Sequence, residues 1–327
     1  SNAAKLSEGF TTSSTDPIMI GQIQIVQVKD FEKAKKAVLK KQKELLEFAN
    51  AQDSMLIKFG GGARKIEVRK IGSGKKTMMI IHLLVDVRDA MGANAINTMC
   101  EKISPMLEEL TGGKTRLRII SNLAIHRLAT AKTMWKKEVL GEETIEAILD
   151  AYEFAKNDVF RCTTSNKGIM NGVDAVVIAT GNDFRAVEAG AHSFAAYKGK
   201  YKPLADYKKD KNGNLVGEIT MPMAVGIIGG ATRTHPMAKL ALKIMNVKTA
   251  KELGEAIICV GMANNFAAMR ALATEGIQRG HMKLHSKNIA ITAGAKGEQV
   301  DKIAAKLVEE KNVSVTRAKE LVEEMNK

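Results

Sequence analysis

The sequence of residues 161–185, RCTTSNKGIMNGVDAVVIATGNDFR, places a short apolar run between polar and charged ends. The apolar run, residues 175–179, is flanked by glycines, which is typical of an inner strand or of part of a core helix. Either element would bring its ends toward the rim of a pocket, where Lys167 and Asp183 could meet. A lysine held near a carboxylate in a partly dry site stays cationic and can stabilise negative charge that develops on a carbonyl oxygen. The alternative is an ordinary surface ion pair, which contributes little.

The segment that precedes this stretch predicts a small α+β unit. Its apolar residues alternate with polar ones where a strand is expected and recur at helical spacing where a helix is expected. The expected order is strand, helix, hairpin, helix and strand, over residues 18–28, 31–50, 65–87, 95–110 and 115–120. No G-x-G-x-x-G motif follows a strand and opens a helix, so the unit is not predicted to be a Rossmann fold.

The turn DAMGAN at residues 89–94 opens the second helix of this unit. Because the N-terminus of a helix favours phosphate, a dinucleotide bound to the unit would use the backbone amides of this turn. Asp89 has an equally good alternative role as the N-cap of the helix.

The middle of the chain predicts a helical region around the opening stretch. Residues 250–273 are apolar nearly all round, which predicts a central buried helix. Asn264 and Asn265 lie on this helix and would need hydrogen bonds, either within a core network or to a ligand. The hydroxyl-rich residues 4–16 predict a loop.

Composition excludes some classes of protein and leaves others open. The chain has 327 residues, 45% of them hydrophobic and 26% charged, which suits a globular protein with two domains. Its longest apolar runs are too short for a membrane helix, and three scattered cysteines indicate neither a zinc site nor a disulfide framework. The net charge of +14 favours anionic partners. Nucleic acid is one candidate, although aromatic residues are few and no nucleic-acid-binding module is present.

Four long segments carry a resemblance to a known family. They are DAMGANAINTM (89–99), RCTTSNKGIMNGVDAVVIATGNDFRAVEAGAH (161–192), MPMAVGIIGGATRTHP (221–236) and NNFAAMRALATEGIQRGHMKLHSKNIA (264–290). In this order they resemble the class II 3-hydroxy-3-methylglutaryl-CoA (HMG-CoA) reductases, and four motifs in register are far more specific than one short glycine-containing piece.

The resemblance implies an oxidoreductase that reduces HMG-CoA to mevalonate and CoA with two hydrides from a nicotinamide cofactor, or runs in reverse. Lys167 would polarise the thioester and then the aldehyde carbonyl, with Asp183 tuning the lysine. His281 would protonate the departing CoA thiolate. The resemblance also assigns substrate-binding roles to Arg161, Asn171 and Asn265.

His281 and His285 are four residues apart and could bind a metal on a helix. A metal is not expected, because the H-E-x-x-H pattern is missing and no third ligand is suggested nearby. A structural role for His281 is the alternative to catalysis.

The resemblance places the cofactor in the small unit. The residues expected to bind it are Asp53, Asp89, Met91, Gly92, Asn94 and Asn122. Asp53 aligns with a carboxylate that contacts the adenine ribose in NADH-using members, and a carboxylate there would repel the 2′-phosphate of NADPH. NADH is therefore the expected cofactor and NADPH the alternative.

The expected fold is α+β and multidomain. A large mixed α/β substrate domain, residues 1–16 and 122–277, would surround the central helix, with a ferredoxin-like dinucleotide-binding domain, 17–121, inserted in it and a C-terminal helical flap, 278–327. The resemblance also implies a cytoplasmic homodimer, or an oligomer of dimers, that binds HMG-CoA, mevalonate and CoA but no nucleic acid or membrane. The catalytic Glu of the family lies upstream of the point that matches Ala4, so the chain as given is expected to reduce the thioester poorly. A non-catalytic CoA- or nucleotide-binding protein is the remaining alternative.

Overall fold

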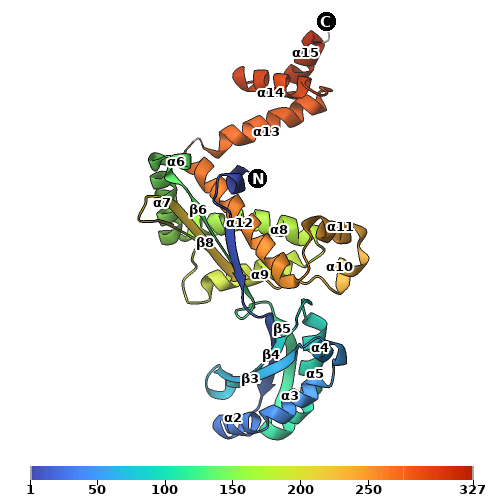
Figure 1. Cartoon of the computed structure of the whole chain (residues 1–327). Coiled ribbons are helices and arrows are strands. Elements are labelled where there is room, and N and C mark those ends of the chain that lie inside the picture. Colours follow the sequence, from blue (N-terminus) through green and yellow to red (C-terminus); the bar gives the residue numbers. More distant parts are fainter. Residues whose placement is uncertain (1, 275, 326–327) are drawn as a thin grey trace.

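The protein is described by a computed structural model that covers residues 2–274 and 276–325, without the side chains of residues 75, 233 and 277–284. Figure 1 shows a small unit at one end, a larger unit in the middle and a group of helices at the other end. The buried apolar residues of the described part form a separate cluster in each of the three regions.

The small unit is a four-stranded antiparallel sheet with helices against one face. Its elements are β2 Ile18–Val26, α2 Phe31–Lys40, α3 Gln42–Asn50, α4 Ser54–Lys58, β3 Gly62–Ile71, a 3-10 turn Gly74–Lys76, β4 Met78–Asp86, α5 Ala93–Thr111 and β5 Lys114–Ser121. The strand order β3-β4-β2-β5, with every pairing antiparallel, is that of a ferredoxin-like β-α-β-β-α-β succession. The predicted strands and hairpin are confirmed, whereas the helix expected over 31–50 is divided at Lys41 into α2 and α3.

The large unit is built on a second antiparallel sheet, of order β1-β6-β8-β7. Its elements are α1 Asn2–Lys5, β1 Phe10–Ser14, β6 Leu128–Trp135, α6 Lys137–Leu140, α7 Glu142–Asn157, α8 Val159–Ala179, α9 Phe184–Ala196, β7 Ala205–Lys209, β8 Leu215–Pro222, α10 Gly230–Thr234, α11 Pro236–Met245 and α12 Ala250–Ala273. The expectation of a mixed α/β unit is therefore wrong, because the described strands pair antiparallel throughout.

The prediction of a loop over residues 4–16 is also wrong. Residues 10–14 form β1 and pair with β6, a strand that was not predicted. Thr12 and Ser14 donate hydrogen bonds of 2.7 and 2.8 Å to the carboxylate of Glu255 on α12, so these hydroxyls are satisfied inside the fold. Threonine is β-branched and suits a half-buried strand, which explains how a hydroxyl-rich segment becomes part of the sheet.

The helix α12 packs against α8 in the centre of the large unit (Figure 1). Glycines bring the two backbones together: a Cβ on Gly172 would lie 2.9 Å from Val260 O, and one on Gly261 would lie 2.8 Å from Val173 Cγ2. The expectation that α12 is buried nearly all round holds for one face, whereas Val260 on the other face is 40% exposed. By length and apolar composition α12 passes the test for a membrane span, as the core helix of a globular domain also can.

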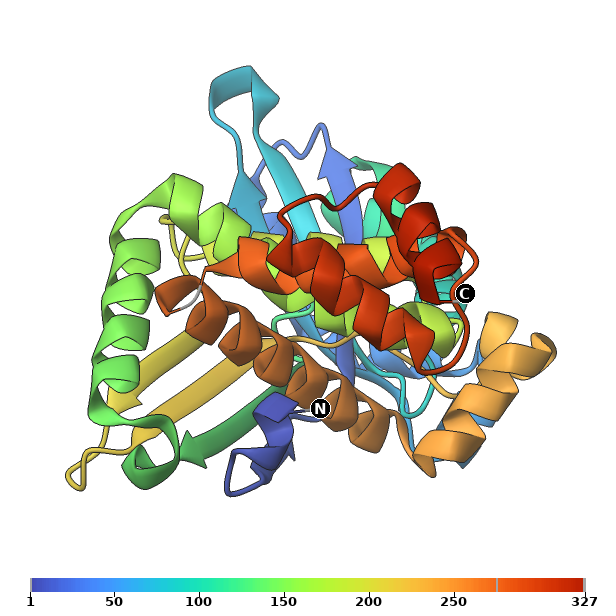
Figure 2. The same cartoon turned by 90° about the horizontal axis from the view of Figure 1, so that it is seen from above.

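The C-terminal helices form a unit of their own. The helices expected over residues 278–327 are present as α13 Ile277–Thr292, α14 Gln299–Glu309 and α15 Val315–Met325, which pack together. In Figure 1 the three helices extend away from the central sheet, and Figure 2 shows them from above.

Candidate functional site between the small and large units

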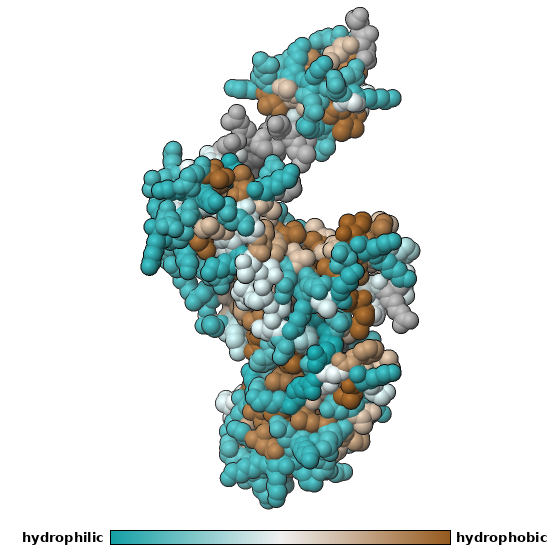
Figure 3. Space-filling view, viewed as in Figure 1, coloured by the Kyte–Doolittle hydropathy of each residue, from teal (hydrophilic) through white to brown (hydrophobic). Residues whose placement is uncertain are grey.

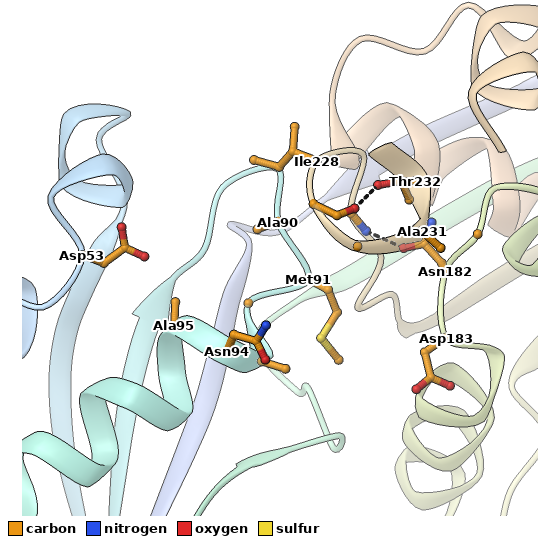
Figure 4. Close-up of a pocket in the computed structure, with 16 residues that line it drawn as sticks. Asp53, Ala90, Met91, Asn94, Ala95, Asn182, Asp183, Ile228, Ala231 and Thr232 are labelled. Atoms are coloured by element: carbon orange, nitrogen blue, oxygen red, sulfur yellow. Dashed lines mark hydrogen bonds between the residues drawn. The ribbon is translucent and has the colours of Figure 1, made fainter. Parts of the chain in front are cut away.

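A pocket of about 410 Å³ lies where the small unit meets the large one. The small unit contributes Asp53 and the start of α5, and the large unit contributes the α8–α9 turn and the glycine-rich segment before α10. The lining residues are Asp53, residues 90–95, residues 181–183, Gly226 and residues 228–232. Figure 4 shows Asp53 on one side, Asp183 on the other, and Met91 and Asn94 between them. Among the predicted cofactor ligands, Asp53, Met91, Gly92 and Asn94 therefore share this pocket.

The N-terminus of α5 opens into the pocket without a side-chain cap. Its N-cap position is Gly92, which has φ of 98°, and no acidic residue lies in the first turn. A Cβ on Gly92 would lie 2.4 Å from Val87 Cγ1, so both the backbone conformation and the space require glycine. The first amides of this 19-residue helix are left for a ligand, and the helix dipole favours an anion there.

The opposite wall approaches this turn closely. A Cβ on Gly226 would lie 2.7 Å from Met91 N, and Ile227 N donates a 2.9 Å hydrogen bond to Asp89 O. Asn182 accepts a 2.8 Å hydrogen bond from Gly226 N through its side-chain oxygen (Figure 4). The α8–α9 turn, the glycine-rich segment and the 89–91 turn are thus held together by backbone contacts.

Arg127, a residue that was not predicted, ties the two units together from behind the pocket. It is 5% exposed, and its guanidinium donates to Ala90 O at 3.0 Å and to Val225 O. Burial lowers the pKa of Arg127 to about 10, and the nearby carboxylates of Asp89 and Asp86 oppose this effect. Arg127 directly precedes β6, a strand that the sequence pattern did not predict.

The alternative interpretation, in which Asp89 caps α5, is wrong, because the N-cap position of α5 is Gly92. The Asp89 carboxylate accepts a 2.7 Å hydrogen bond from Ala250 N, the first residue of α12. The side chain therefore joins the small unit to the N-terminus of the central helix, and it is outside the set that lines the pocket.

Asp53 and Asn122 have different surroundings. Asp53 caps α4 by accepting a 2.9 Å hydrogen bond from Leu56 N, and it lines the pocket. Asn122 is exposed, lies outside the pocket lining, and packs through its backbone against α9, where a Cβ on Gly190 would lie 2.6 Å from Asn122 O.

The apolar run 175–179 is helical and belongs to α8, which continues from Val159 to Ala179. Lys167 and Asn171 lie four residues apart and are both exposed, so they share one face of this helix. Arg161 lies near the N-terminus of α8, with its guanidinium 3.7 Å from Met269 Sδ on α12.

Lys167 and Asp183 do not meet within one chain. About 18 Å of helix separates Lys167 from the end of α8, at 1.5 Å per residue, and Asp183 lies beyond that end. Asp183 instead caps α9 and forms a paired hydrogen bond with Arg185, at 3.0 Å to each carboxylate oxygen. The Arg185 guanidinium holds the pKa of Asp183 below its usual range, against the opposing effect of burial.

Asn264 and Asn265 are hydrogen-bonded within the core. Asn265 is buried and accepts a 2.7 Å hydrogen bond from Tyr207 Oη, and Asn264 donates to Gly168 O at 2.6 Å. These contacts favour the core-network alternative for both asparagines.

The side chain of His281 lies outside the described residues, although its backbone is part of α13. His285 is exposed. Within the part of the chain that the structure describes, no group of three or more His, Cys, Asp and Glu side chains is arranged to hold a metal ion.

Comparison with known proteins identifies a family and several relatives that this chain resembles. Residues 1–286 match the family described as hydroxymethylglutaryl-coenzyme A reductase. The 3-hydroxy-3-methylglutaryl-coenzyme A reductase of Archaeoglobus fulgidus is 56% identical over 329 residues, which cover 99% of this chain and 75% of that protein. The probable reductase of Borreliella burgdorferi is 39% identical over 236 residues, 70% of this chain and 54% of the relative.

Solved structures agree with the sequence relatives. The class II 3-hydroxy-3-methylglutaryl-CoA reductase from Streptococcus pneumoniae, solved bound to NADPH in open conformations, is similar with a TM-score of 0.82 and 39% identity. The alignment covers 100% of this chain and 80% of that one. The chain therefore belongs to the hydroxymethylglutaryl-coenzyme A reductase family.

Proposed function

We propose that the protein reduces HMG-CoA to mevalonate and free CoA, with two equivalents of a reduced nicotinamide cofactor, as a step of mevalonate and isoprenoid precursor metabolism. The observation that carries this proposal is the 56% identity to the Archaeoglobus fulgidus reductase across 99% of the chain. The pocket between the small and large units supports it, because all of its lining except Asp53 comes from segments of the family-like motifs.

The pocket fits a nicotinamide dinucleotide. The uncapped N-terminus of α5 suits a pyrophosphate, and Gly229 and Gly230 on the facing wall have open space where a Cβ would stand. When bound, the cofactor supplies hydride to the substrate carbonyl carbon. Met91, Gly92 and Asn94 would hold it, with Asp53 at the ribose end.

Cofactor preference follows from the groups around Asp53. Of the basic residues nearby, Arg64 already donates to Gly60 O and lies 3.5 Å from the Asp86 carboxylate, which leaves it poorly placed for a 2′-phosphate. A carboxylate near the ribose accepts hydrogen bonds from its hydroxyls and repels a 2′-phosphate. NADH is thus the preferred cofactor in this proposal, and NADPH, which is bound in the Streptococcus pneumoniae relative, is the alternative.

The chemistry of the substrate site is assigned to side chains on α8, α9 and α13. Lys167 stabilises the negative charge that develops on the carbonyl oxygen, and Asp183 tunes the lysine. His281 protonates the CoA thiolate as it leaves. Arg161 pairs with a substrate carboxylate, and Asn171 hydrogen-bonds the substrate.

A second copy of the chain completes this site. Lys167 and Asp183 are both exposed, but about 18 Å of helix separates Lys167 from the end of α8 and Asp183 lies beyond that end, so a two-fold partner can bring one to the other. Large apolar side chains are exposed on the same unit: Phe160 at the start of α8 is 82% exposed and Ile244 on α11 is 76% exposed. Figure 3 shows brown, apolar atoms gathered over the α11 region. An apolar surface of this kind is typical of a protein–protein interface.

The same proposal divides the chain into a large substrate-binding part, 1–16 and 122–277, a cofactor-binding part, 17–121, and a C-terminal flap, 278–327, in a cytoplasmic enzyme. The experiment follows the absorbance of the reduced cofactor near ~340 nm after the protein is mixed with HMG-CoA. Acetyl-CoA, which lacks the carboxylate-bearing branch, serves as the matched control substrate. The absorbance should fall with HMG-CoA but not with acetyl-CoA. If HMG-CoA causes no loss of absorbance with NADH or with NADPH, the proposal is overturned.

A further inference from the structure

A hydrogen-bond chain of four ionisable side chains lies beside α8 and has no role in the chemistry proposed above. Asp174 on α8 and Glu188 on α9 have their carboxyl groups within hydrogen-bonding range of each other. Glu188 Oε2 is 2.9 Å from His192 Nε2, and His192 Nδ1 is 2.7 Å from Tyr201 Oη. The chain therefore runs from α8 through α9 to the loop after α9.

The far end of this chain returns to α8. Asn166 donates a 2.9 Å hydrogen bond to Lys202 O, next to Tyr201, and accepts one of 2.9 Å from Leu204 N. Asn166 directly precedes Lys167, and Asp174 lies one turn after Asn171. The hydrogen-bond chain and the loop that carries Tyr201 thus contact α8 on both sides of the residues proposed to act on the substrate.

With one proton shared between the two carboxyl groups, every donor in the hydrogen-bond chain has an acceptor. If Asp174 is protonated, it donates to Glu188, which also accepts from His192 Nε2–H, while His192 Nδ1 accepts from the Tyr201 hydroxyl. Asp174 Oδ1 is buried and has no hydrogen-bond partner among the described residues. An unpaired carbonyl oxygen of a neutral acid costs far less than an unpaired oxygen of a buried carboxylate, so the geometry favours the protonated form.

We propose that Asp174, Glu188, His192 and Tyr201 form a one-proton hydrogen-bond chain that holds α9 against α8 and thereby positions Lys167 and Asn171. The four are positioning residues, and their role in turnover rests on the proposed function, whereas the hydrogen-bond chain itself does not. Glu188 is the charged group that acts on Asp174 from α9, and Glu188 and the Cys162 thiol act on Tyr201.

The protonated Asp174 carboxyl loses its proton near neutral pH. Burial, together with the hydrogen bond and charge of Glu188, raises the pKa of Asp174 to about 7. In the unfolded chain the same carboxyl ionises near its ordinary value, so the folded state holds more protons between the two values, and stability falls as pH rises through this window. Above it, two adjacent carboxylates repel each other and the contact between α8 and α9 weakens.

The experiment measures the melting temperature and kcat/KM of the full chain from about pH 5.5 to about pH 9. Asp174→Asn keeps the shape and supplies the donor permanently, and Glu188→Gln supplies it from the other side. Asp174→Ala removes the link. Asp150→Asn, an exposed carboxylate on the neighbouring α7, is the matched control.

Wild type and Asp150→Asn should lose melting temperature as pH rises through neutrality, whereas Asp174→Asn and Glu188→Gln should show flat melting profiles. In kcat/KM the two variants should retain only the pH dependence of the proposed general acid, His281. Asp174→Ala should lower kcat/KM by about ten-fold even at low pH, and Asn at the same position should restore it. Wild-type profiles in both Asp174→Asn and Glu188→Gln would overturn the inference. If wild type oxidises no cofactor at any pH, the proposed function fails, while the melting curves still decide the hydrogen-bond chain.

Discussion

At the scale of single residues, Lys167 carries the largest part of the proposed chemistry. Its side chain is exposed on α8 and makes its important interaction only when negative charge forms on the substrate oxygen. Lys167→Ala should therefore lower kcat by about 10³-fold or more while KM for HMG-CoA changes little. Steady-state kinetics with isothermal binding of HMG-CoA checks this, and a variant with wild-type kcat would remove Lys167 from the mechanism.

Asp53 is the residue through which cofactor choice can be tested. Replacing it by Asn removes the charge but keeps a cap for α4, because the amide oxygen can still accept from Leu56 N. Asp53→Asn should improve the kcat/KM ratio of NADPH over NADH by about ten-fold. Glu47→Gln on the exposed face of α3 is the control. Wild type that already prefers NADPH would contradict the assignment of Asp53.

Arg127 tests the structural tie behind the pocket. Arg127→Met removes the donors to the buried Val225 carbonyl and to the partly buried Ala90 carbonyl. The free energy of unfolding should fall by about 2–4 kcal/mol, since an unsatisfied buried group costs ~1–3 kcal/mol. Chemical denaturation measures this loss. Lys132→Met, an exposed residue of β6, should change stability little, and equal losses in the two variants would contradict the role of Arg127.

At the scale of elements, the small unit was predictable from the sequence and the large sheet was not. Alternation of apolar and polar residues along the expected strands of the small unit specifies local structure, and these strands were found. The strands β1 and β6 were missed because threonine and serine hide the alternation that apolar residues would display, and the hydroxyls of β1 have their partner, Glu255, on a helix distant in sequence.

The candidate site shows the same division. The amide-rich turn at residues 89–94 was predicted because a helix start is a local feature. The position of Lys167 relative to Asp183 was not, because spacing alone does not reveal that α8 runs unbroken to Ala179. The roles of Arg127 and of the hydrogen-bond chain at Asp174 could not be predicted from the sequence, because burial and contacts between distant residues are properties of the folded protein.

Gly226 tests how closely the elements must approach at the pocket. Gly226→Ala would place a Cβ 2.7 Å from Met91 N, a backbone atom that cannot move aside cheaply. The two walls should separate, and the cofactor Kd should rise by about ten-fold, since overpacking of this kind costs ~1–3 kcal/mol. Gly168→Ala serves as the control, because a Cβ at this position meets no atom within 4 Å. Gly199 is unsuitable as a control because it has positive φ. Unchanged cofactor fluorescence titrations for Gly226→Ala would contradict the close approach.

At the scale of the whole molecule, the distance between Lys167 and Asp183 makes a strong prediction about assembly. If one active site takes Lys167 from one copy and Asp183 from the other, Lys167→Ala and Asp183→Ala dimers are each inactive. A refolded or coexpressed equal mixture contains mixed dimers with one intact site, so it should regain about one quarter of wild-type activity. A mixture as inactive as its two components would show that the site does not draw these residues from different copies.

The most direct measurement of the central claim counts products. With HMG-CoA limiting and reduced cofactor in excess, the wild-type protein should oxidise two equivalents of cofactor for each CoA thiol released, because reduction of a thioester to an alcohol needs two hydrides. The cofactor is followed by absorbance and the thiol by a disulfide reagent in the same sample. A ratio of two that disappears in Lys167→Ala is the predicted result. No thiol release from HMG-CoA with either NADH or NADPH would contradict the account.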